Sequence, residues 1–149
     1  MAETLTAQEI GQAIQKPSES LDAAIYRFIN WSKMGLIKPH GEQHPGRGRH
    51  KRFTATNLLE ALLMQTIIDA FGSSALSARQ SVEAIKKMIS KPHFDSAKQA
   101  LVLSRGPGGI SIARVKFDGI GKYILESELD AHMVLNLQNI LARIPSKED

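Results

Sequence analysis

The chain has 149 residues, 42% hydrophobic and 23% charged, a balance typical of a folded globular protein rather than a disordered one. It contains no cysteine, which excludes disulfides, thiolate zinc sites and cysteine nucleophiles. Residues 1–10 lack the basic start and apolar run of a signal peptide, and the most apolar stretch, 58–68, is too short to cross a bilayer. We therefore expect a cytoplasmic protein without membrane contact.

The formal net charge of +4 is distributed unevenly along the chain. Residues 38–52 contain five basic side chains and one acidic side chain, and residues 79–116 contain eight basic and two acidic ones. Residues 118–149 instead carry a net charge of −3. Both basic regions are candidates for contact with a polyanion such as nucleic acid.

Local signals in the first part of the chain predict two helices joined by a turn. Thr6 and Glu9 form a capping-box pattern, which predicts a helix over about 7–15. Ser20 is a good N-cap for a second helix, because apolar residues recur after it at spacings of three and four. Gly35 stands where a left-handed C-terminal cap is expected.

The next segment has the pattern of a wing. Leu36 and Ile37 predict a very short strand, and Arg52 and Phe53 predict its partner strand. Between them, residues 38–50 contain prolines and glycines that prevent a helix and predict a loop.

Two further helices are expected before the composition changes. Thr54 caps the first, which should end near Gly72, and either Ser74 or Ser77 begins the second. The second should stop at Pro92.

The last third of the chain predicts a hairpin and short elements. Residues 100–104 and 110–115 are prone to form strands and flank a glycine-rich turn. Residues 122–130 have a helical pattern, whereas residues 133–137 fit a strand and a helix equally well. A final short helix is expected around residues 140–144.

Two sequence segments resemble the MerR family of bacterial transcription regulators. Residues 31–39, Trp-Ser-Lys-Met-Gly-Leu-Ile-Lys-Pro, resemble the family segment in which an aromatic residue precedes Gly-Leu and a proline at the entry to the wing. Residues 52–58, Arg-Phe-Thr-Ala-Thr-Asn-Leu, resemble the segment that leaves the wing. The likeness covers roughly residues 5–90. After Pro92 the chain departs from the family, because a hairpin replaces the usual long coiled-coil helix.

The sequence patterns and the resemblance together predict an α+β, mainly α, protein with two parts. Residues 1–92 would form a MerR-like winged helix-turn-helix domain, and residues 93–149 would form an appendage of a β-hairpin and a C-terminal helix. The family arginine expected in the second helix falls nearest Ile29 in this chain, so Arg27 is only a candidate replacement. We expect the second helix to enter the major groove of double-stranded DNA.

Candidate DNA-binding residues fall into two groups. A polar stripe on the second helix would read base edges, since Arg and Asn pair bidentately with guanine and adenine. Basic residues of the wing would contact phosphates or the minor groove. The stripe is Tyr26, Arg27, Asn30 and Lys33, and the basic set is Lys38, Arg47, Arg49, Lys51 and Arg52.

Other patterns have structural explanations. The polar stripe on the second helix can also be an ordinary solvated helix face. The aromatic residues Phe28, Trp31 and Phe53 are assigned to the core rather than to base stacking. The glycine-rich turn at 106–109 lacks the Lys-Ser/Thr of a phosphate loop, so a hairpin explains it. We expect no enzyme, cofactor or metal. His40, His44 and His50 lack a carboxylate at helical spacing, and Asp118, Glu126, Glu128 and Asp130 are read as a solvated face.

These observations predict a sequence-specific DNA-binding transcriptional regulator that acts as a homodimer, with RNA polymerase as a further partner implied by the resemblance. Alternatives are a phage-like or recombination accessory factor that bends DNA, and a winged-helix adaptor that binds protein instead. Dimerisation through the appendage is expected because the hairpin exposes strand edges and because the terminal apolar residues exceed what so small an appendage can hide, unless they pack on the helices of the same chain. These residues are Leu129, Met133, Leu137, Ile140, Leu141 and Ile144.

Overall fold

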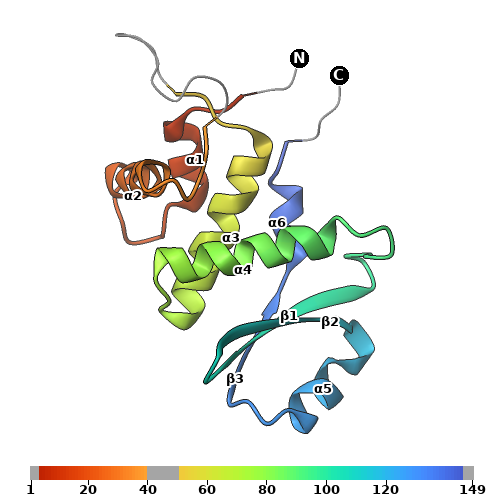
Figure 1. Ribbon diagram of the computed structural model, residues 1–149. Helices are drawn as coiled ribbons and strands as arrows, with labels where there is room; N and C mark the ends of the chain where they lie inside the picture. Colours follow the sequence, from red (N-terminus) through yellow and green to blue (C-terminus); the bar gives the residue numbers. More distant parts are fainter. Residues whose placement is uncertain (1–3, 40–50, 146–149) are drawn as a thin grey trace.

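The computed structural model describes residues 4–39 and 51–145. In these ranges the chain is an α+β protein with six α-helices, one 3-10 turn and a three-stranded antiparallel sheet. Helices α1 and α2 form a pair, α3 and α4 cross the middle of the molecule, and the sheet lies beyond them with α5 on its far side (Figure 1). The elements are α1 (Ala7–Ile14), α2 (Leu21–Lys33), α3 (Ala55–Phe71), α4 (Ala75–Ile89), β1 (Gln99–Gly106), β2 (Gly109–Lys116), η1 (Phe117–Gly119), α5 (Ile120–Glu126), β3 (Ala131–Leu135) and α6 (Leu137–Ala142).

The first four helices begin at the capping residues predicted from the sequence. At α1, the Glu9 amide donates to Thr6 Oγ1 at 3.1 Å, and the Thr6 amide donates to Glu9 Oε2 at 3.2 Å. Ser20, Thr54 and Ser74 accept in the same way at the starts of α2, α3 and α4. Side-chain oxygens thereby satisfy amides that a helix start leaves unpaired.

The predicted strand at Leu36 and Ile37 is wrong. Gly35 adopts a left-handed conformation with φ of 77°, and the Leu36 amide donates to the Trp31 carbonyl at 3.0 Å, so this amide closes α2. Leu36 and Ile37 lie in a bend with both side chains buried, whereas a strand would alternate them between two faces. Phe53 pairs instead with Leu5, through amide-to-carbonyl bonds of 2.9 and 2.7 Å. Of the loop predicted at 38–50, residues 40–50 lie outside the described residues.

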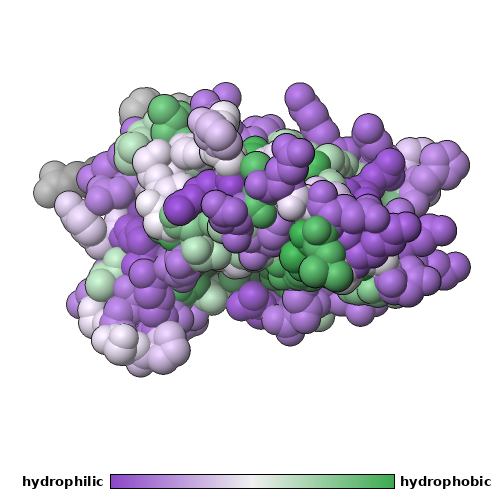
Figure 2. Space-filling view, turned by 90° about the horizontal axis from the view of Figure 1, so that it is seen from below, coloured by the Kyte–Doolittle hydropathy of each residue, from purple (hydrophilic) through white to green (hydrophobic). Residues whose placement is uncertain are grey.

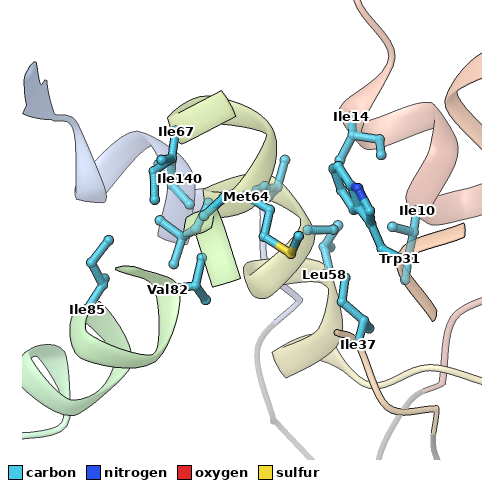
Figure 3. Packing of buried hydrophobic residues seen from close by; sticks show 14 of the residues in the cluster. Ile10, Ile14, Trp31, Ile37, Leu58, Met64, Ile67, Val82, Ile85 and Ile140 are labelled. Atoms are coloured by element: carbon cyan, nitrogen blue, oxygen red, sulfur yellow. The ribbon is translucent and has the colours of Figure 1, made fainter. Parts of the chain in front are cut away.

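One hydrophobic core joins the helices to the sheet. Its members come from α1 to α4, from β1 and β3, and from α6. Trp31 is only 4% exposed and packs among side chains of α1 and α3, as predicted for a core residue (Figure 3). The rings of Phe28 and Phe53 meet edge to face with centroids 4.7 Å apart, and this contact fixes α2 against the segment before α3.

The hairpin forms as predicted. β1 and β2 pair from Gln99 with Lys116 to Gly106 with Gly109, and Gly109 has a φ of 112° that favours glycine. Residues 133–137, which fitted both a strand and a helix, contribute mainly to strand β3, which pairs with the other side of β1. The order of the sheet is therefore β2-β1-β3.

Helix α5 differs from the predicted helix over 122–130. It begins earlier and ends at Glu126, because Ser127 is extended and the chain turns back toward β3. Leu129 then packs on the hairpin at Gly106, where a Cβ atom would lie 2.8 Å from Leu129 Cδ2. The chain between α5 and β3 therefore does not continue the helix.

The six appendage residues predicted to form a dimer contact are buried or partly buried within the same chain. Leu137 and Ile140 belong to the common core, and Met133, Leu141 and Ile144 pack against it. The expectation that this surface is too large to hide is wrong, since α6 contacts α3 and the sheet contacts α4. The alternative, packing on the helices of one chain, is confirmed.

Candidate nucleic-acid interface

Helix α2 presents three of the four predicted stripe residues toward its outer side. Tyr26 is 65% exposed, Asn30 is partly exposed, and Lys33 is exposed in the last turn. The opposite side of the helix is fixed by buried Ala24, Phe28 and Trp31, which belong to the core. The periodicity that buries one side of α2 therefore directs the polar stripe outward.

Arg27, the fourth residue of the stripe, differs from these three because its guanidinium is engaged in hydrogen bonds within the chain. Its guanidinium donates to both carboxylate oxygens of Glu19 at 2.7 Å and to the carbonyl of Ile14 at 3.3 Å. The side chain is only 21% exposed. Arg27 thus ties α2 to the end of α1 and to the turn between the two helices, which is a structural role.

Glu19 is held in its ionised form by this arrangement. Hydrogen bonds from the Arg27 side chain, followed by one from the Lys16 backbone amide at 2.7 Å, lower the pKa of Glu19 from 4.5 to about 2. A carboxyl group whose pKa is lowered by folding stabilises the fold above its unfolded pKa. That contribution is lost as the pH falls from about 5 toward 2.

We expect Glu19→Gln to lower the free energy of unfolding by about 1–2 kcal/mol at neutral pH, because two charge-assisted hydrogen bonds are weakened. The difference from wild type should shrink as the pH falls below about 4.5, where Glu19 of the unfolded chain is protonated. Urea unfolding at a series of pH values measures it. Glu126→Gln, at an exposed carboxyl group far along the chain, is the control. A difference that does not change with pH would contradict the proposed ion pair.

A groove lies beside the C-terminal end of α2. Its volume is about 380 Å³, and it is bounded by the start of α1, the last turn of α2 and the chain that leads to Phe53. Lys33 comes from α2 and Lys51 from the chain before Phe53, and the described lining includes no acidic residue. The buried hydroxyl of Ser32, also in this lining, has no hydrogen-bond partner among the described residues. The lining is Thr6, Ala7, Gln8, Ile29, Ser32, Lys33, Lys51 and Phe53.

The remaining predicted basic residues are only partly placed by the structure. Lys38 is exposed. Arg52 is exposed too, but its guanidinium donates to Thr4 Oγ1 at 2.9 Å and to the Thr4 carbonyl at 3.1 Å. Arg47, Arg49 and the three histidines His40, His44 and His50 lie outside the described residues.

The second basic region is partly neutralised by a buried carboxylate that the sequence analysis missed. Glu60 is 3% exposed and accepts hydrogen bonds from Lys86 at 2.9 Å, from Asn57 at 3.0 Å and from Arg79. Burial favours the protonated form of Glu60, but these hydrogen bonds outweigh it and lower its pKa. Arg79 and Lys86 also contact Glu83, so both cations are paired within the chain. The only sequence signal was a lone acid within the apolar run of α3.

The other end of the molecule offers a more open hollow of about 630 Å³. Lys98 and Lys116 contribute to its lining, but so do Asp95 and Asp118, so its charge does not favour a polyanion. The described ranges contain no group of three potential metal ligands, and none of their helices is long and apolar enough to span a membrane. Among the described residues, the groove beside α2 is therefore the better candidate for nucleic acid.

Comparison with known proteins adds no family assignment. No family model matches this chain, and no curated protein matches it. The likeness to the MerR family rests on residues 31–39 and 52–58 alone.

Proposed function

We propose that the chain is a sequence-specific double-stranded DNA-binding protein that regulates transcription, with a MerR-like winged helix-turn-helix in its N-terminal part, in which a bend stands where the first wing strand was expected. The observation that carries the proposal is the placement of Lys33 and Lys51 around a groove whose described lining contains no acidic residue, beside the outward face of α2. Lysine ammonium groups at such a place suit the phosphates of a duplex. Exposed Lys38 extends the same charge toward the predicted wing.

Within this proposal the roles of the α2 residues differ. Asn30 and Tyr26 reach base edges in the major groove, where an Asn side chain pairs with adenine. Lys33, Lys38 and Lys51 bind phosphates and set the register of α2. Arg27 holds the helix pair together and does not contact bases, because its guanidinium already donates hydrogen bonds to Glu19.

The proposal includes a homodimer, because one small module makes few base and phosphate contacts and a two-fold pair doubles them. Contact with RNA polymerase follows from the family resemblance. A protein-binding adaptor is the alternative that the first measurement tests, since an adaptor would not bind duplex DNA.

Binding to random duplex DNA across a salt series tests the proposal. The double variant Lys33→Gln, Lys51→Gln is expected to bind more weakly and to reduce the slope of log affinity against log salt by about two units, roughly one for each lost phosphate contact. Lys87→Gln combined with Lys91→Gln removes two exposed lysines elsewhere and should change the slope little.

Sequence choice is tested on a site selected from random DNA. Asn30→Ala is expected to cost about 1–3 kcal/mol on that site and to leave random-duplex binding nearly unchanged. Absence of any duplex binding by wild type, or equal effects of the two lysine double variants, would refute the proposed interface.

A further inference from the structure

Strand β3 is an edge of the sheet. Its five residues, Ala131–Leu135, pair with β1 on one side, and among the described residues no strand pairs with the other side. An edge strand leaves every second backbone N–H and C=O group without a partner in its sheet. These groups can pair with another extended chain.

The two edges of the sheet differ in charge. β2 carries Arg114 and Lys116, both exposed, and charged side chains of this kind oppose edge-to-edge association. β3 has the sequence Ala-His-Met-Val-Leu, without a lysine, arginine, acid or proline. Val134 on this strand is 44% exposed. β3 thus lacks the side chains that usually protect an edge.

The structure also holds β3 firmly in place. His132 Nδ1 lies 2.7 Å from Ser104 Oγ on β1, and its Nε2 lies 3.1 Å from the Leu129 carbonyl. A carbonyl only accepts, so Nε2 carries a proton, and in the neutral imidazole Nδ1 accepts from the Ser104 hydroxyl. Leu135 is buried in the core. The edge is preformed, and a partner would not have to order it.

We propose that a second copy of this chain docks on β3, with the two β3 strands antiparallel and the two sheets joined into one. The proposal rests on the DNA-binding function, which needs two copies of α2 related by a two-fold axis. The contact is then the edge of the strand rather than the apolar residues expected from the sequence, since Met133, Leu137, Ile140, Leu141 and Ile144 pack in or against the core of one chain.

Charge favours the second copy in this orientation. The chain before β3 carries exposed Glu128 and Asp130, whereas the chain after it carries exposed amides at Asn136, Gln138 and Asn139. An antiparallel pair brings the acidic end of each strand beside the amide end of the other, and amide groups can donate to carboxylates. A parallel pair would place acids beside acids, which repel each other.

The rival contact is the hydrophobic patch on the side where α5 lies (Figure 2). On α5, Leu125 is 87% exposed and Ile124 is also exposed. This patch offers apolar area, but the backbone N–H and C=O groups inside a helix are already paired with each other. The edge of β3 offers backbone groups that can pair with a second strand.

Sedimentation of the full chain without DNA at micromolar concentrations tests the proposal. Wild type is expected to dimerise. Val134→Lys should raise the dissociation constant of the dimer by at least about tenfold. The two copies would then bring two positive charges close together near the two-fold axis, where the strands pair. Leu125→Lys, the same kind of change at a more exposed residue away from the edge, should leave the dimer unchanged.

Hydrogen exchange of wild type at low and high protein concentration is the second measurement, and it does not depend on how a variant folds. Amides of β3 should become more protected as the concentration rises, whereas those of β2 should not. A monomeric wild type, unchanged β3 protection, or dissociation by Leu125→Lys alone would overturn the proposed contact. Loss of duplex binding by wild type instead refutes the DNA-binding function, so the two failures are distinguishable.

Discussion

Replacement of Trp31 with alanine is expected to lower the free energy of unfolding by about 3–5 kcal/mol. The indole is 4% exposed and lies in the core between α1 and α3, where its removal leaves a cavity that three helices border. The Trp31 carbonyl also accepts the Leu36 amide, so its surroundings include the end of α2. Urea unfolding measures the loss.

The fluorescence of this residue gives an independent check, because Trp31 is the only tryptophan in the chain. Its emission is expected to be blue-shifted in the native protein and to change little when duplex DNA is added. Met34→Ala, at an exposed residue three positions later, serves as the control and should change stability by about 0.5 kcal/mol or less. Red-shifted native emission would show that the indole is not buried.

The helices could be predicted because their signals are local. The N-caps Thr6, Ser20, Thr54 and Ser74 each lie next to the helix that they begin, and the left-handed glycines Gly35 and Gly72 close two of these helices. The hairpin was equally local, since a two-residue turn joins its strands. Such signals are contained within a few residues and do not depend on the tertiary fold.

The pairings that failed depend on residues far apart in the chain. The bridge between Leu5 and Phe53 joins segments 48 positions apart, and nothing in either segment selects the other over Leu36 and Ile37. Residues 133–135 also become a strand only because β1 is available to pair with them. Hydrophobic periodicity alone does not distinguish the two states in so short a run.

The candidate site was predictable in residue type but not in contacts. The stripe of α2 followed from helical spacing, and Tyr26, Asn30 and Lys33 do face outward. Arg27 occupies an adjoining position, yet Glu19 in the preceding turn binds its guanidinium. The sequence does not reveal that the turn folds back on α2. It therefore does not show that Arg27, rather than Lys33, is the cation of the stripe that is already paired.

Substitution of Gly11 with valine is expected to lower the free energy of unfolding by about 3 kcal/mol, at the upper end of the usual cost of overpacking. Gly11 is buried where α1 meets α2. A Cβ atom there would lie 2.5 Å from Ile25 Cγ1 and 3.1 Å from the Ile25 backbone, so rotation of the Ile25 side chain would still leave the new valine against the Ile25 backbone. The two helices would have to separate.

Gly121→Val is the matched control. Gly121 also lies inside a helix, α5, but a Cβ atom there meets no atom within 4 Å. Valine has a slightly higher helix propensity than glycine, so this variant should be unchanged or more stable by a few tenths of a kcal/mol. The difference between the two variants in urea unfolding isolates the contact between α1 and α2. Because this contact positions the outward face of α2, Gly11→Val should also weaken duplex binding under conditions where the variant remains folded. Equal stability of the two variants would mean that α1 and α2 are not packed this closely.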